Sequence, residues 1–216
     1  IMTGDINFNG IGGGWTLQDS LKTDNASFVY LNNGSLNTNN QKVLVGRFIS
    51  ANNNTRSLTL GTSEITLLNG GGWQYVWYIS GTGLTFSGAS STINMGQSTG
   101  YLSYPYFYGG SRTYGSVNLY ASGYTYVYDN NRITNLYVYS GNAYINNAVI
   151  TNLSSMDSTN STLSLTSDTV TTVNCFSSQE FSLSGNNVIG SLTRSGVGNT
   201  TFGTGTSTIS KFNCTS

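Results

Sequence analysis

The feature that most constrains this chain is a two-residue alternation of apolar and polar side chains in very short segments. The segments at residues 58–60, 65–67, 84–86, 93–95 and 163–165 each place two apolar residues two positions apart. Gly, Asn or Ser bounds each segment, as is typical of short β-strands and their turns. Apolar residues at helical spacing do not extend far enough anywhere for a helix. The sequence therefore predicts an all-β fold.

Clusters of asparagine between these segments distinguish stacked coils from a sandwich of hairpins. They occur at residues 32–33, 39–40, 52–54, 130–131, 146–147 and 186–187. Asn tolerates the left-handed conformation, which suits sharp corners, and its amide can form hydrogen-bonded ladders between coils. Pro105 is the one proline of the chain, and this scarcity of proline favours strands that are paired on both sides. We predict a parallel β-helix or β-solenoid of short stacked strands with Asn/Gly corners.

We expect residues 1–216 to form a single elongated solenoid with three compositional zones. Residues 1–100 carry Gly-Gly-Gly-Trp and Leu-x-Leu repeats, residues 101–150 are rich in Tyr, and residues 151–216 are rich in Ser and Thr. The Gly-Gly-Gly-Trp motif occurs at residues 12–15 and 70–73. Neither "GIGGGW" nor "NGGGWQ" contains the Lys-Ser/Thr pair of a P-loop, which argues against a phosphate loop. We interpret the glycines as a corner and the Trp as the start of the next strand.

The segment "GGGWTLQDSL", followed by "GSLNTNNQKVLVGRFIS" and "TRSLTLGTSEITL", resembles the repetitive β-solenoid modules of bacterial surface proteins and phage fibre or tail proteins. The resemblance covers roughly residues 5–95 and weakens in the Tyr-rich zone. It implies an extracellular shaft or attachment module on a virion or a bacterial cell surface.

The charged residues exclude several classes of function. The chain has 8 Lys and Arg, 8 Asp and Glu, and no His. This balance argues against nucleic-acid binding, and the longest apolar runs are too short to insert into a membrane. Without His a Ser-His-Asp triad is impossible, and two cysteines without His cannot make a standard zinc site. The acids are scattered and show no evident pair for glycoside hydrolysis. We expect no catalytic residues, no metal site, no cofactor and no enzymatic activity.

Two cysteines, Cys175 and Cys214, lie 39 positions apart. In an oxidising compartment they could pair and staple the last coils, provided that their Cα atoms lie within about 7 Å. Otherwise both remain free thiols.

The tyrosines are the most informative feature for function, since 12 of the 15 fall between Tyr101 and Tyr144. Strand alternation predicts that Val127, Leu136 and Val138 point inward and that the neighbouring tyrosines point outward. The predicted aromatic face consists of Tyr124, Tyr126, Tyr128, Tyr137 and Tyr139, with Trp73 and Trp77 as further candidates. Such a face could bind sugar rings or a partner protein, or it could only stabilise the sheet.

Together these features favour a non-enzymatic structural and attachment module of a phage fibre, virion or bacterial surface appendage. Its expected partners are other subunits of the assembly, in an oligomer, and cell-surface glycan. The competing interpretation is a tail-spike type of glycan-cleaving depolymerase on the same β-helix scaffold.

Overall fold

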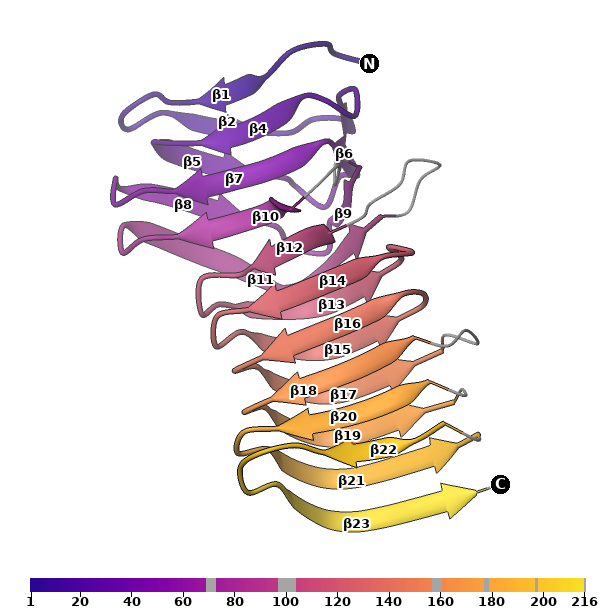
Figure 1. Ribbon diagram of the computed structural model, residues 1–216. Coiled ribbons are helices and arrows are strands. Elements are labelled where there is room, and N and C mark those ends of the chain that lie inside the picture. The colour runs from indigo at the N-terminus through magenta and orange to yellow at the C-terminus, as the bar shows by residue number, and fades with distance from the viewer. Residues whose placement is uncertain (69–72, 97–103, 157–160, 177–178, 197, 216) are drawn as a thin grey trace.

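The computed structural model is an elongated stack of coils with the two chain ends at opposite ends (Figure 1). It describes residues 1–216 except 69–72, 97–103, 157–160, 177–178, 197 and 216, and the side chain of Trp73. The described residues contain strands and turns but no helix, and hence no helix that could cross a membrane. Neighbouring strands pair in parallel across about ten turns, which confirms the predicted all-β solenoid.

One strand from every coil joins a ten-stranded sheet. In stacking order these strands are β1 (Ile6–Phe8), β4 (Phe28–Leu31), β7 (Arg47–Ala51), β10 (Trp73–Ser80), β12 (Tyr104–Tyr108), β14 (Tyr124–Tyr128), β16 (Asn142–Asn146), β18 (Thr162–Thr166), β20 (Glu180–Ser184) and β22 (Thr200–Phe202).

The rest of each coil belongs to a thirteen-stranded sheet. Its main path is β2 (Gly14–Thr16), β5 (Gly34–Asn37), β8 (Arg56–Thr59), β11 (Leu84–Met95), β13 (Thr113–Leu119), β15 (Arg132–Val138), β17 (Val149–Ser155), β19 (Thr169–Cys175), β21 (Val188–Ser195) and β23 (Thr208–Thr215). Three short strands pair beside it: β3 (Leu21–Lys22), β6 (Val43–Val45) and β9 (Glu64–Leu67).

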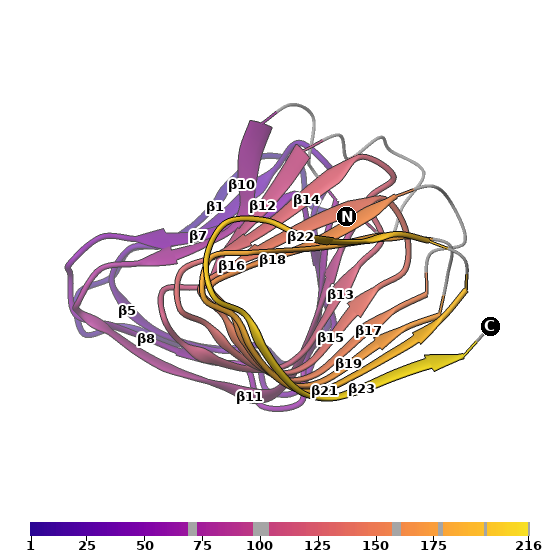
Figure 2. The ribbon, with the colours of Figure 1, turned by 60° about the horizontal axis from the view of Figure 1, so that its bottom comes forward.

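The coils change shape along the stack. In the first three coils, the second and third sides are separate strands, such as β8 and β9. Strand β11 joins these sides, because its first part pairs with β8 and its last part with β9. From β13 onward a single strand forms both sides, and Figure 2 shows the earlier coils of β5 and β8 extending further to one side.

A kink inside each of these later strands separates the second side of the coil from the third. In β15 the buried residues Ile133 and Leu136 are three positions apart, so the two-residue alternation is interrupted once. The ladder to β17 skips Thr134 at this point and resumes at Asn135. A strand with strict alternation would instead run straight.

Aromatic rings stack inside the solenoid as well as outside it. Phe48, Trp77 and Phe107 lie in successive coils, with ring centroids 4.9 Å and 6.3 Å apart. The prediction that Trp77 lies on the outer aromatic face is wrong, since its side chain is fully buried. A register shift between Tyr75 and Trp77 reverses the alternation within β10. The indole N–H of Trp77 donates to the hydroxyl of buried Tyr114, 3.1 Å away.

Asparagine forms many of the corners, as predicted. Asn39, Asn40, Asn130 and Asn147 have positive φ angles. The predicted amide ladders are also present. The side chain of Asn52 donates to that of Asn32 at 3.1 Å, and Asn32 donates to Asn7 at 3.0 Å. Each ladder satisfies polar groups between coils and fixes their vertical register.

The first Gly-Gly-Gly-Trp motif forms a compact corner. Gly12 has a φ of +71°, and Trp15 lies in β2, with its ring against Gly10 and Gly13. Gly34 of the next coil approaches so closely that a Cβ atom would lie 2.5 Å from the Gly13 carbonyl oxygen. The glycines of the second motif lie outside the described residues. Trp73 does begin β10, but in the other sheet from Trp15, so the two motifs occupy different corners.

Candidate functional site

The tyrosines of β14 point away from the solenoid, as alternation predicts. Val127 and Thr125 are buried, whereas Tyr124 is 37% exposed and Tyr126 and Tyr128 are half-buried. Leu136 and Val138 in β15 are likewise fully buried. The predicted direction of the alternation is therefore confirmed. The role of these rings in binding stays a prediction.

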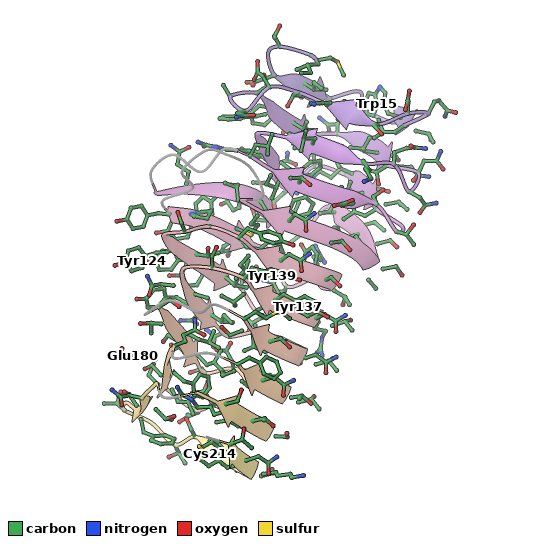
Figure 3. The ribbon with its side chains drawn as sticks, turned by 90° about the vertical axis from the view of Figure 1, so that its right-hand side faces the viewer. Trp15, Tyr124, Tyr137, Tyr139, Glu180 and Cys214 are labelled. Carbon is green, nitrogen blue, oxygen red and sulfur yellow. The ribbon has the colours of Figure 1, made fainter. Side chains whose placement is uncertain are left out.

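The predicted tyrosines do not all lie on one face. Tyr124, Tyr126 and Tyr128 belong to the ten-stranded sheet, whereas Tyr137 lies on β15 in the other sheet and Tyr139 directly follows it. Figure 3 shows Tyr124, Tyr139 and Tyr137 in this order across the side of the molecule. The rings thus lie on two sides of the solenoid, because both the turn after Tyr128 and the kink within β15 separate β14 from Tyr137 along the chain.

The larger group of rings lies on the ten-stranded sheet, and we call it the tyrosine face. It consists of Tyr75, Tyr78, Tyr104, Tyr106, Tyr108, Tyr124, Tyr126, Tyr128 and Tyr144. Parallel pairing stacks β10, β12, β14 and β16 directly on one another. The prediction from sequence did not include the members outside β14. The segment "YPYFY" at residues 104–108 has the same alternation as "YTYVY" at residues 124–128 and could have identified three of them.

The rings of the tyrosine face stack on each other along the solenoid axis. The centroids of Tyr106 and Tyr126 are 4.8 Å apart, and those of Tyr126 and Tyr144 are 5.2 Å apart, with planes inclined by 14° and 16°. Tyr104 and Tyr124 are almost parallel, at 5.3 Å and 3°. Neighbouring rings therefore cover each other's faces. Within the stack, the ring edges and their hydroxyl groups form the outer surface.

The tyrosine face is polar but uncharged. Burial raises the pKa of Tyr126 to about 12, with a further contribution from the neighbouring phenols, Tyr106 first. Burial also raises the pKa values of Tyr106, Tyr128 and Tyr144. All these phenols are therefore neutral at physiological pH, and each hydroxyl can both donate and accept a hydrogen bond.

The stack of rings ends at β16. In the central column Tyr144 pairs with Ser164 of β18. On one side of this central column, Tyr124 pairs with Asn142 of β16. On the other side, Tyr128 is the last outward residue of β14, and Asn146 follows it in the next coil. The outward side chains of β18 and β20 are Thr and Ser, with Glu180 at one edge.

Three of the described acidic residues have structural surroundings. Asp24 accepts hydrogen bonds within its own turn, from the hydroxyl and backbone N–H of Ser27, and these lower its pKa. Glu64 forms an ion pair with Lys42 at 3.3 Å. Asp168 is buried in a corner of the solenoid. Within the described part of the chain, no three His, Cys, Asp or Glu residues are grouped as a metal site would require.

The possible disulfide between Cys175 and Cys214 does not form. Cys175 pairs with Arg194 of the next coil, and Arg194 pairs with Cys214 of the coil after that. Two strand spacings separate the cysteines by about 10 Å, beyond the reach of a disulfide. Both thiols are free, Cys175 buried and Cys214 exposed. Burial raises the pKa of Cys175 to about 12.

The side chain of the remaining candidate, Trp73, lies outside the described part of the structure. Comparison of the chain with protein-family models, with curated proteins and with solved structures finds no match. The tyrosine face is therefore interpreted from its own geometry.

Proposed function

We propose that this chain is a non-enzymatic attachment module that binds glycan through the tyrosine face. The observation that carries the proposal is the continuous, uncharged set of nine outward tyrosines on four consecutive coils. Sugars present C–H groups and hydroxyl groups side by side, and phenols match both, with an apolar ring and a polar tip. A patch of this kind on a soluble protein usually marks an interaction site.

The surrounding scaffold suits an attachment role. Every coil is hydrogen-bonded to its neighbours by a parallel ladder, and the interior is filled by stacked apolar side chains. Such a stack is a stiff rod that holds a surface at a fixed position. We propose that the module belongs to a phage fibre, virion or bacterial surface appendage, where a stiff, glycan-binding rod would mediate attachment.

The surroundings of three acids support binding rather than hydrolysis. Asp24 and Asp168 contact turn or corner groups, Glu64 contacts Lys42 and Asn94, and none of the three acids lies on the strands of the tyrosine face. Glycoside hydrolysis needs two carboxyl groups that flank one sugar bond. We therefore propose that the chain binds its glycan without cleaving it.

The test compares two triple variants on a glycan array and on insoluble polysaccharides. Replacement of Tyr124, Tyr126 and Tyr144 by Ser is expected to abolish binding. The matched control, with Tyr120, Tyr137 and Tyr139 of the neighbouring side replaced by Ser, is expected to retain it. Circular dichroism checks that both variants fold, and a Tyr→Phe version of the first variant keeps the rings.

Three results would contradict the proposal. One is the absence of glycan binding by the unmodified chain. Another is release of oligosaccharides during the assay, which would indicate a depolymerase. The third is self-association of the chain, measured by sedimentation velocity, that depends on the three tyrosines while glycan binding does not. The tyrosine face would then be a subunit interface.

A further inference from the structure

The place where the ring stack ends offers a contact that its interior does not. Tyr144 stacks beneath both Tyr126 and Tyr124, at 5.2 Å and 6.0 Å. These contacts cover the ring face that points toward β14. On the opposite side the next residue of the column is Ser164. A serine side chain is too short to cover a phenol ring, so none of the described residues places a ring against the second face of Tyr144.

Polar side chains surround this ring face. Asn142 and Asn146 flank Tyr144 on β16, and Thr162, Ser164 and Thr166 lie one coil further on β18. We call these six residues the Tyr144 step. The side-chain oxygen of Asn142 accepts the backbone N–H of Thr162 at 2.8 Å, which fixes the orientation of its amide. Among the described residues its Nδ2 group has no acceptor.

We propose that the Tyr144 step binds one ring of a neutral saccharide, with the sugar's C–H face against Tyr144. A pyranose ring carries C–H groups on its face and hydroxyls at its rim. The slightly positive C–H groups are attracted to the negative face of the phenol. The rim hydroxyls meet the amides and hydroxyls of the other five residues, which both donate and accept hydrogen bonds.

The charges at the Tyr144 step select a neutral ligand. None of its six residues is ionisable near neutral pH, since burial raises the pKa of Tyr144. Glu180 of β20 pairs with Thr162 and is exposed at the edge of the Tyr144 step. Its carboxylate would repel an acidic sugar such as a uronic acid. Because binding then depends little on charge, we expect its affinity to change little with salt.

This inference rests on the proposed function and places the ligand at one end of the tyrosine face. The probes are cellohexaose, chitohexaose, maltohexaose and xylohexaose, with hexagalacturonic acid as the charged comparison. Isothermal titration calorimetry measures affinity for the full chain. Nuclear magnetic resonance detects the upfield ring-current shift of sugar C–H protons that lie over an aromatic face. We expect a neutral hexasaccharide to bind with such shifts, and the acidic one not to bind.

Two leucine substitutions form a matched pair. Ser164→Leu covers the open face of Tyr144 without removing its ring, and should weaken binding by about tenfold, the size of one well-packed aromatic contact. Ser154→Leu makes the same change on the other sheet, where Ser154 follows Tyr137 in its column. It should leave the affinity unchanged. Tyr144→Phe keeps the ring and should lower affinity by less than about threefold, because one hydroxyl contact is lost.

Each outcome separates the two proposals. Binding that the Tyr124/Tyr126/Tyr144→Ser variant loses but Ser164→Leu retains would place the glycan elsewhere on the tyrosine face. The inference would then fail and the proposed function would stand. Equal losses in Ser164→Leu and Ser154→Leu would also overturn the inference. If no saccharide binds the unmodified chain, the proposed function itself fails. Thermal unfolding of every variant confirms that it is folded.

Discussion

Asp168 is a single residue with consequences for the stability of the whole solenoid. Its carboxylate is buried in a corner and accepts the backbone N–H groups of Ala148 and Thr166, at 2.6 Å and 2.7 Å. Burial raises its pKa to about 7, and the two backbone hydrogen bonds offset only part of this effect. An unfolded aspartate titrates near 3.9. The folded state therefore binds this proton more tightly than the unfolded state.

The sign of the pH dependence follows from this difference. The stabilising contribution is fully present below the unfolded pKa and is lost as pH rises toward 7. We expect the free energy of unfolding to fall by roughly 2–3 kcal/mol between pH 5 and pH 8. Urea denaturation at several pH values measures this decrease. Asp24 has the opposite shift and titrates below this range.

Asp168→Asn should remove the dependence. Asn131 and Asn187 occupy the equivalent corner position of other coils and are buried there, so an amide fits. The variant has no titrating group in the corner, and its free energy of unfolding should change by less than about 1 kcal/mol over the same pH range. An equal decrease in both proteins would show that another group causes it.

The cysteines give a second test at the scale of single residues. Cys175 is buried with a raised pKa, and Cys214 is exposed. Only the exposed thiol should react with Ellman's reagent in the native chain, because reaction requires an accessible thiolate. Denaturation without reductant should release the second thiol. A count of zero under both conditions would reveal a disulfide and contradict the register of β19, β21 and β23.

At the scale of a strand, the stacked tyrosines should stabilise the sheet whether or not they bind a ligand. Tyr126 contacts the rings of Tyr106, Tyr128 and Tyr144. Tyr126→Ser should lower the free energy of unfolding by about 1–2 kcal/mol, because cross-strand aromatic contacts are lost. Tyr126→Phe keeps the stacking and should change it by less than about 0.5 kcal/mol. Equal effects of both variants in urea denaturation would mean that the hydroxyl, and not the ring, matters.

Strand elements also show how far the sequence predicts this structure. Strict alternation in "YTYVY" predicts the inward and outward residues of β14 correctly, because nothing interrupts the strand. The same reasoning fails for Trp77, because a register shift precedes it within β10. Such a shift is decided by packing against two neighbouring coils, which local alternation does not contain.

The kinked strands carry a signal that the alternation analysis missed. Ile-Thr-Asn-Leu at residues 133–136 recurs at residues 150–153, and both copies form the kink between two sides of a coil. Its spacing would also have placed Tyr137 on a different side from Tyr126. The tyrosine stack and the burial of Asp168 depend on the vertical register of coils, which is set by the whole stack and not by any short segment.

At the scale of the whole molecule, stability should vary along the stack, because each coil contacts only its neighbours. Within the described structure β22 pairs with β20 and β23 pairs with β21. Phe202 pairs with Leu183 and Phe212 with Leu192, yet the phenylalanines are 64% and 54% exposed, whereas both leucines are buried. In a polypeptide of residues 1–216, β22 and β23 therefore pack against one neighbouring coil, whereas the central strands pack against two.

Hydrogen exchange of the full chain should show this gradient. The hydrogen-bonded amides of β15 and β17 open only with their neighbouring coils, whereas those of β23 open by local fraying. The β23 amides should therefore exchange at least about a hundredfold faster than those of β15 and β17. At low protein concentration, equal protection of the amides along the stack would contradict this expectation. Protection of β23 that rises with concentration would instead show that a second copy covers the last coil, since only intermolecular contact depends on concentration.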